Sequence, residues 1–199
     1  MDTVSNACIC WRAGIIILMQ QRSTSSTRSP AAKVFLALWP SAVEREQLRQ
    51  WQAPLLQTCG GRAMQADTLH CTLVFVGLVV PDELAVLQDT VQNIDVAAFD
   101  LWLDRVYYWG HNHIIYAAPS CVPQQMQQLV GRLEQQLTRI HIHFDRRSYQ
   151  PHVTLLRNAR CKDTPLPAVP AVCWRANEYS LVQSTQQGYR VLANFPLLA

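Results

Sequence analysis

The chain has 199 residues, of which 49% are hydrophobic and 16% charged, and its formal net charge is +3 at pH 7. This balance excludes a disordered protein and suits one globular domain with a buried core. An apolar run at Ile15–Met19 is too short to span a bilayer, and Asp2 and Arg12 argue against a signal peptide. We therefore expect a cytoplasmic protein without a membrane segment.

The cysteines point to the same compartment. Seven is an odd number, and no two of them form a C-x-x-C pair. Neither a disulfide framework nor a zinc ribbon follows from such a pattern. We expect reduced thiols.

Residues 1–32 contain a Ser/Thr-rich stretch from Ser23 to Ser29 and no periodic apolar pattern after the short run. We expect a poorly ordered N-terminal extension over residues 1–32 and a folded domain over 33–199. In the domain, Ser41 and Glu44 form a capping-box pattern at the start of the first helix. Apolar spacing and turn residues predict the following elements: strand 33–39, helix 41–56, strand 68–77, helix 82–93, hairpin 99–118, helix 123–140, strand 149–156, and a last hairpin of strands 173–183 and 189–193.

Two of the predicted strands share a motif. Leu69–Leu73 and Pro151–Leu155 each place a His and a Thr two residues apart in an apolar run. Side chains at i and i+2 of a strand leave on the same face, so each strand aims one imidazole and one hydroxyl in a common direction. Cys71, between them in the first motif, should face the core.

Because the two motif strands occupy similar places in two loosely similar halves, we expect an α+β protein. Two similar sheet lobes with flanking helices would form a central cleft, related by a pseudo-two-fold axis, with one motif from each lobe.

The paired motifs carry the groups that in-line chemistry at a phosphodiester needs. Histidine titrates near neutral pH, so one of His70 and His152 could accept a proton while the other donates one. The hydroxyls of Thr72 and Thr154 could bond to the phosphate oxygens. Arg157 is the nearest arginine that could bind phosphate. Strict alternation places it on the wrong face, so a bulge or strand end is required.

The second motif lies in a basic part of the chain. Between residues 139 and 162, six Lys and Arg residues stand against one acid, Asp145. Such a field favours an anionic ligand, although a solvated Arg-rich loop explains the charges equally well.

Other chemistries have weaker support. The H-x-H pairs at 111/113 and 141/143 have no acidic or thiolate partner at a metal-ligand spacing, so we expect no metal site. No Gly-rich phosphate loop is present, and Ser180 and Ser184 lack the context of a nucleophile elbow.

With these motifs and flanks, the chain resembles the RNA 2′,3′-cyclic phosphodiesterases, or 2′-5′ RNA ligase-like proteins, of the 2H phosphoesterase superfamily. The segments that carry the resemblance are Val34–Pro40, Leu69–Gly77 and Pro151–Arg157, within residues 33–199. The resemblance implies the two-lobed fold and hydrolysis of RNA 2′,3′-cyclic phosphodiesters to 2′-phosphomonoesters, without a metal or nucleotide cofactor.

The same resemblance implies a role for each site residue. His70 would donate a proton to the leaving 3′ oxygen, and His152 would accept one from water. Thr72, Thr154 and Arg157 would bind the phosphate. Cys71 departs from the larger aliphatic residue common at its position.

The implied partner is RNA with a 2′,3′-cyclic phosphate end, or a small cyclic nucleotide, and we expect a monomer. Some family members also join RNA ends through a 2′,5′ linkage, the reverse sense of the same chemistry. Phe35 could stack on a base or serve as a core residue. Two alternatives stay open: an RNA- or nucleotide-binding module without activity, and a phosphoesterase for another small cyclic phosphate such as ADP-ribose 1″,2″-cyclic phosphate.

Overall fold

The computed structural model describes residues 30–161 and 165–199. Their elements, in chain order, are β1 (Ala32–Leu38), α1 (Ala42–Cys59), β2 (Arg62–Ala63), η1 (Ala66–Thr68), β3 (Cys71–Val79), α2 (Pro81–Val91), β4 (Phe99–Leu103), β5 (Arg105–Trp109), β6 (Ile114–Ala118), α3 (Gln124–Arg139), β7 (Val153–Arg157), β8 (Val172–Ala176), β9 (Glu178–Thr185) and β10 (Gly188–Pro196). The expected extension over 1–32 lies outside the described residues up to position 29, and β1 includes Ala32.

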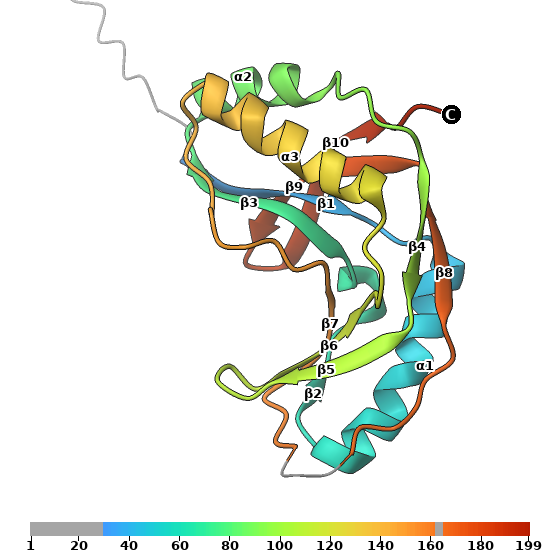
Figure 1. The fold of residues 1–199 in the computed structure, drawn as a ribbon. Helices are drawn as coiled ribbons and strands as arrows, with labels where there is room; N and C mark the ends of the chain where they lie inside the picture. The colour runs from blue at the N-terminus through green and yellow to red at the C-terminus, as the bar shows by residue number, and fades with distance from the viewer. Residues whose placement is uncertain (1–29, 162–164) are drawn as a thin grey trace, which may run out of the picture.

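The strands form two lobes that meet at β3 and β7 (Figure 1). The hydrogen-bonded order is β10-β9-β1-β3-β7-β6-β5, with β2 added to β7. β3 and β7 pair at Cys71 and Val153, so one bridge joins the lobes into a single bent sheet. Helices α2 and α3 cover the first lobe and α1 runs along the second (Figure 1). The predicted α+β fold with two lobes is confirmed.

Strand β1 shows how one strand serves both the core and the cleft. Val34, Leu36 and Leu38 are fully buried in the main hydrophobic core. The alternate residues point to the other face, where Phe35, Ala37 and Val182 form a small cluster bordered by Trp39 and Tyr189. The same alternation on β3 buries Cys71 behind the cleft, as predicted.

Helix α1 begins as the sequence predicts. The Ser41 side chain accepts a hydrogen bond from the Val43 amide at 3.2 Å and contacts the Glu44 carboxylate. The helix ends at Cys59 rather than near residue 56, because Gly60 adopts a positive φ of 60° and its amide bonds to the Leu56 carbonyl at 2.8 Å.

The predicted hairpin over residues 99–118 is wrong in its first half. The strand is interrupted at Asp104, whose carboxylate accepts two bonds from Ser120, each 2.7 Å long. Before this residue β4 pairs with β8, and after it β5 pairs with β6. The predicted strand 173–183 is likewise divided into β8 and β9 at Asn177. β4 and β8 therefore form a separate two-stranded sheet.

The expectation that all cysteines are reduced is also wrong. Cys59 and Cys161 form a disulfide across a sequence separation of 102, with Cα atoms 4.6 Å apart. The end of α1 meets the chain after β7, where the Arg160 amide bonds to the Cys59 carbonyl at 2.8 Å. Within residues 30–161 and 165–199, Cys71, Cys121 and Cys173 are free.

Among the described residues, none of the helices is long and apolar enough to cross a membrane.

Candidate active site

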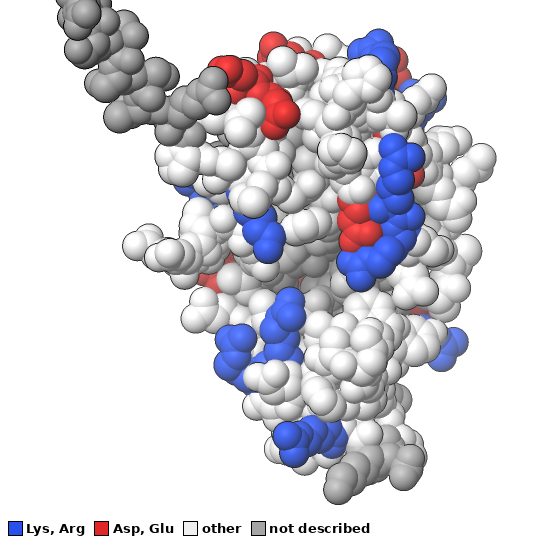
Figure 2. Space-filling model, turned by 90° about the vertical axis from the view of Figure 1, so that its left-hand side faces the viewer, with Lys and Arg blue, Asp and Glu red and all other residues white. Residues whose placement is uncertain are grey.

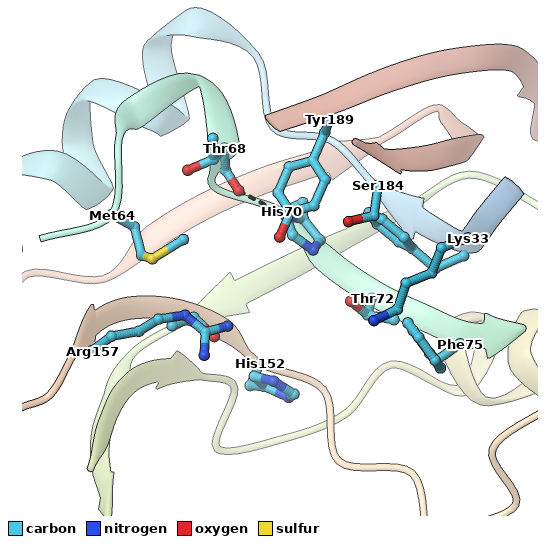
Figure 3. Close-up of a pocket in the computed structure, with 12 residues that line it drawn as sticks. Lys33, Met64, Thr68, His70, Thr72, Phe75, His152, Arg157, Ser184 and Tyr189 are labelled. Atoms are coloured by element: carbon cyan, nitrogen blue, oxygen red, sulfur yellow. Dashed lines mark hydrogen bonds between the residues drawn. The ribbon is translucent and has the colours of Figure 1, made fainter. Parts of the chain in front are cut away.

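All six predicted site residues line one cavity of about 290 Å³ between the lobes: Phe35, His70, Thr72, His152, Thr154 and Arg157. Figure 2 shows the hollow on the concave face, with basic side chains above and below it. The close-up places His70 and His152 on opposite sides of the cavity, each from a different lobe (Figure 3).

The lobe junction explains why the two motifs converge. Each histidine immediately precedes its strand, and the central residues of the two motifs, Cys71 and Val153, are the pair that joins the sheet. In an antiparallel pair of this register, His70 lies towards Thr154 and Thr72 lies towards His152. By register, each histidine is therefore opposite the threonine of the other motif.

Both imidazoles are fixed by the same local hydrogen bond. His70 Nδ1 donates to the Thr68 carbonyl at 2.7 Å (Figure 3), and His152 Nδ1 donates to the Gln150 carbonyl at 2.7 Å. A carbonyl oxygen only accepts, so Nδ1 carries the proton and each Nε2 is left for a ligand in the cavity. A neutral ring accepts a proton at Nε2, and a protonated ring donates one there.

Burial and local charge favour the neutral form of both histidines. Burial lowers the pKa of His70 to about 4; the bond to the Thr68 carbonyl opposes this shift, and positive charge at His152 and Arg157 adds to it. Burial lowers the pKa of His152 as well, with Arg157 again contributing. A bound anion would counter these effects by favouring the protonated imidazoles.

Arg157 reaches the cavity through the bulge that the sequence argument required. The register between β6 and β7 pairs Tyr116 with Thr154 and Ile115 with Leu156, so Leu155 is skipped. The extra residue returns Arg157 to the cavity face, where it lies with His152 (Figure 3). Thr154 lines the same cavity.

The other motif has the same bulge. On β3, Thr72 pairs with Ala37 and Val74 pairs with Leu36, so Leu73 is skipped. Phe75, the third residue after Thr72, therefore lines the cavity where Arg157 does in the second motif. The pseudo-two-fold relation extends to the backbone irregularities, while the residue at this position differs.

Several cavity residues were not anticipated. Lys33, two residues before Phe35 on β1, brings a second cation, and its Nζ lies 5.4 Å from the centre of the Phe75 ring. The i, i+2 rule could have found it. Tyr189 reaches the cavity because β10 pairs with β9 and β9 with β1, a long-range pairing that no local pattern shows.

Aromatic rings surround both imidazoles. Trp39 stacks on His70 at 5.1 Å and 9°, and Phe35 and Tyr189 lie 5.1 and 4.9 Å from the same ring. Phe35 is only 3% exposed. This burial favours a packing role for Phe35, and its stacking on a base stays a prediction.

The charges near the cavity suit an anion. Lys33 and Arg157 line it, and among the described lining residues there is no Asp or Glu. Of the basic residues in this part of the chain, Arg157 lines the cavity, whereas Arg147 pairs with Asp145 outside it. The part of the chain that the structure describes contains no cluster of three or more His, Cys, Asp or Glu suited to a metal ion.

Two antiparallel lobes around a cavity with one His-x-Thr pair from each define the 2H phosphoesterase fold. The family model of the 2′-5′ RNA ligase superfamily matches residues 39–187, and the chain belongs to this family. The resemblance seen in the sequence is thereby confirmed.

Individual relatives support the same family assignment. The chain is 31% identical over 131 residues to the RNA 2′,3′-cyclic phosphodiesterase of Escherichia coli (strain K12), covering 66% of this chain and 74% of the relative. The crystal structure of E. coli LigT in apo form matches with a TM-score of 0.75 and 27% identity, over 86% of this chain and 100% of LigT. LigT complexed with 3′-AMP gives the same TM-score and identity, over 85% of this chain and 99% of that one.

Proposed function

We propose that this protein hydrolyses 2′,3′-cyclic phosphodiester ends of RNA to 2′-phosphomonoesters by two-histidine acid–base catalysis. The observation that carries the proposal is the pair of imidazoles, fixed by matching Nδ1 bonds, on opposite sides of a cavity with two threonines and an arginine. The E. coli relative is named for this activity, and the LigT structure with 3′-AMP supports a nucleotide as the ligand.

Each group has a role in the proposed reaction. His152 Nε2 takes a proton from a water, whose oxygen attacks phosphorus opposite the 3′ oxygen. The bond from phosphorus to O3′ breaks, and His70 Nε2 gives its proton to O3′. Thr72, Thr154 and Arg157 stabilise the charge on the non-bridging oxygens. The histidines then exchange protons with solvent to return to their starting states.

The low pKa of His70 fits this role only if the substrate changes it. At a pKa of about 4 the free imidazole is neutral near pH 7. A phosphodiester anion in the cavity favours the imidazolium, because it replaces lost hydration and opposes the positive field of Arg157. Substrate binding thus favours protonation of His70, which then donates this proton to O3′.

Joining of RNA ends is a second candidate, favoured by the family match to 2′-5′ RNA ligases. It is the same displacement with a 5′-hydroxyl in place of water. RNA selectivity would come from the 2′ oxygen held in the cyclic phosphate. The monomeric state and cytoplasmic location expected from the sequence stay predictions.

The test is hydrolysis of 2′,3′-cyclic AMP, or of a short RNA with a cyclic phosphate end, in EDTA, with phosphorus NMR of the product. We expect a 2′-phosphomonoester, and losses of about 100-fold or more in His70→Ala and His152→Ala. His111→Ala, an exposed turn histidine outside the cavity, is the matched control.

Other outcomes would contradict the proposal or favour one of the alternative functions. A 3′-phosphate product would contradict the assignment of the leaving oxygen. Loss of all activity in EDTA would contradict a metal-independent reaction. Binding of the cyclic nucleotide without turnover would favour a binding module, and turnover of only another cyclic phosphate would favour the altered-substrate alternative.

A further inference from the structure

The β5–β6 hairpin carries three aromatic rings on its cleft face, which we call the aromatic ladder: Tyr107, Tyr116 and Trp109. The Tyr107 and Tyr116 rings are 5.6 Å apart at 30°, and the Trp109 and Tyr116 rings are 4.0 Å apart at 32°. Tyr107 is paired with Tyr116 across the hairpin, and Tyr107 and Trp109 share a face of β5 because they are two residues apart.

The ladder is continuous with the candidate active site. Tyr116 is paired with Thr154, so the row continues from Tyr107 through Tyr116 to a threonine of the cavity. The Trp109 ring meets His152 edge-on at 4.7 Å, and the Tyr116 ring does so at 5.6 Å. The rings thus lead from His152 towards β5, the last strand of the sheet order.

The outer end of the ladder is exposed and lies beside an arginine. Tyr107 is 46% exposed, whereas a ring that served the core would be buried. Arg105 lies two residues before Tyr107 on the same face of β5; its side chain is 62% exposed, and its Nε lies 3.8 Å from the Asp104 carboxylate. A row of aromatic rings that ends in an arginine suits a nucleobase followed by a backbone phosphate.

In the displacement at phosphorus, the attacking oxygen and the leaving oxygen lie on opposite sides. The side on which the ladder lies therefore decides which nucleoside the ladder could bind. This step rests on the proposed function, in which His152 faces the attacking oxygen and His70 the leaving 3′ oxygen. The nucleoside of the cyclic phosphate hangs from the leaving side, where Phe35, Trp39 and Tyr189 contact His70. The ladder contacts His152, so it lies on the attacking side, and a water there needs no aromatic surface.

We propose that the aromatic ladder is the stacking site for the nucleoside of a second RNA end, whose 5′-hydroxyl takes the place of the attacking water. The 5′-hydroxyl gives its proton to His152 Nε2, and its oxygen bonds to phosphorus. The bond to O3′ breaks, and O3′ receives the proton of His70 Nε2. The product is a 2′,5′-phosphodiester with a free 3′-hydroxyl, and no further reactant is consumed.

The test measures how the enzyme divides a cyclic-phosphate RNA between water and a short oligoadenylate with a 5′-hydroxyl. The readout is the ratio of 2′,5′-joined product to 2′-phosphate product. We expect Tyr107→Ala to lower this ratio on the order of tenfold, because base–aromatic stacking contributes substantially to such binding. Tyr107→Phe should keep the ratio, since the ring remains.

The matched control is Trp102→Ala, which removes a ring that is 54% exposed on β4 and outside the ladder. It should leave both products unchanged. A ratio that is unchanged in Tyr107→Ala would overturn the proposal, as would a wild-type enzyme that hydrolyses the donor but yields no joined product. A wild-type enzyme that does not hydrolyse the donor at all would instead overturn the proposed function.

Discussion

The surroundings of His70 favour its neutral form without an anion and its protonated form when an anion is bound. Its Nδ1 proton is donated to the Thr68 carbonyl, and burial lowers its pKa to about 4. The neutral ring avoids the cost of a buried charge beside Arg157. An anion at Nε2 reverses the preference, so proton and anion should bind together.

This coupling predicts that anion affinity rises as the pH falls. Between about pH 7 and about pH 5 His70, with its pKa of about 4, is largely neutral without an anion, whereas a bound sulfate favours its protonated form; binding therefore takes up a proton. The pKa of His152 is also lowered by burial, so His152 adds to this uptake. Sulfate keeps its charge over this range. Isothermal titration should show tighter binding at the lower pH, by at most about tenfold per pH unit for each proton taken up.

His70→Asn should lessen the pH dependence of sulfate binding and leave the part due to His152. His111→Asn should preserve the whole dependence. Sulfate affinity that stays constant across this range in the wild-type protein would contradict the coupling, and would mean that the imidazoles do not contact the anion.

At the scale of the elements, the bulge in β7 depends on a residue of α1. Gln52 is 5% exposed, and its Nε2 donates to the carbonyls of Met64 at 2.8 Å and Leu155 at 3.1 Å. Leu155 is the bulged residue, and its carbonyl also accepts from the Met64 amide at 2.9 Å. The helix thus holds β2 and β7 in the register that turns Arg157 inward.

A double-mutant cycle tests this positioning role. Gln52→Met removes the donor at similar length, and we expect it to lower kcat/KM for 2′,3′-cyclic AMP about tenfold by releasing the bulge. Arg157→Met should cost on the order of 100-fold, because it removes a charged phosphate contact. In the double variant, the loss should be close to that of Arg157→Met alone. Losses that multiply would show that Gln52 does not act through Arg157.

The elements also show where sequence reasoning succeeds. The His-x-Thr faces, the Ser41 cap and the requirement for a bulge before Arg157 follow from local rules of alternation and hydrogen bonding, and the structure confirms them. Lys33 could have been found by the same alternation. The imidazole–carbonyl bonds could not, because no pattern fixes the turn before each motif.

At the scale of the molecule, the missed features are contacts between distant segments. β4 pairs with β8 rather than β6, Tyr189 enters through two successive strand pairings, and Cys59 meets Cys161. Local periodicity specifies which face of a strand is apolar but not its partner. The number of cysteines likewise does not predict which two of them the fold brings together in a disulfide.

The disulfide encloses both motifs within one covalent loop, because its sequence separation of 102 spans His70 and His152. In the chain-entropy model a loop of this length stabilises the folded state by up to about 4–5 kcal/mol, since it restricts the unfolded chain. Cys161→Ser should therefore lower the free energy of unfolding in urea, by an amount up to this limit. The control is Cys121→Ser, which removes an exposed free thiol and should leave the midpoint unchanged.

The same variant separates the stability of the molecule from the geometry of its site. The motif pairing at Cys71 and Val153, and the Gln52 bonds to the bulge, do not involve the disulfide. Cys161→Ser should thus retain most of its cyclic phosphodiesterase activity at low temperature while unfolding at a lower urea concentration. Equal urea midpoints for oxidised wild type and Cys161→Ser would show that the cross-link adds nothing to stability. A large loss of activity in a fully folded variant would instead show that the cross-link positions the end of β7, and with it Arg157.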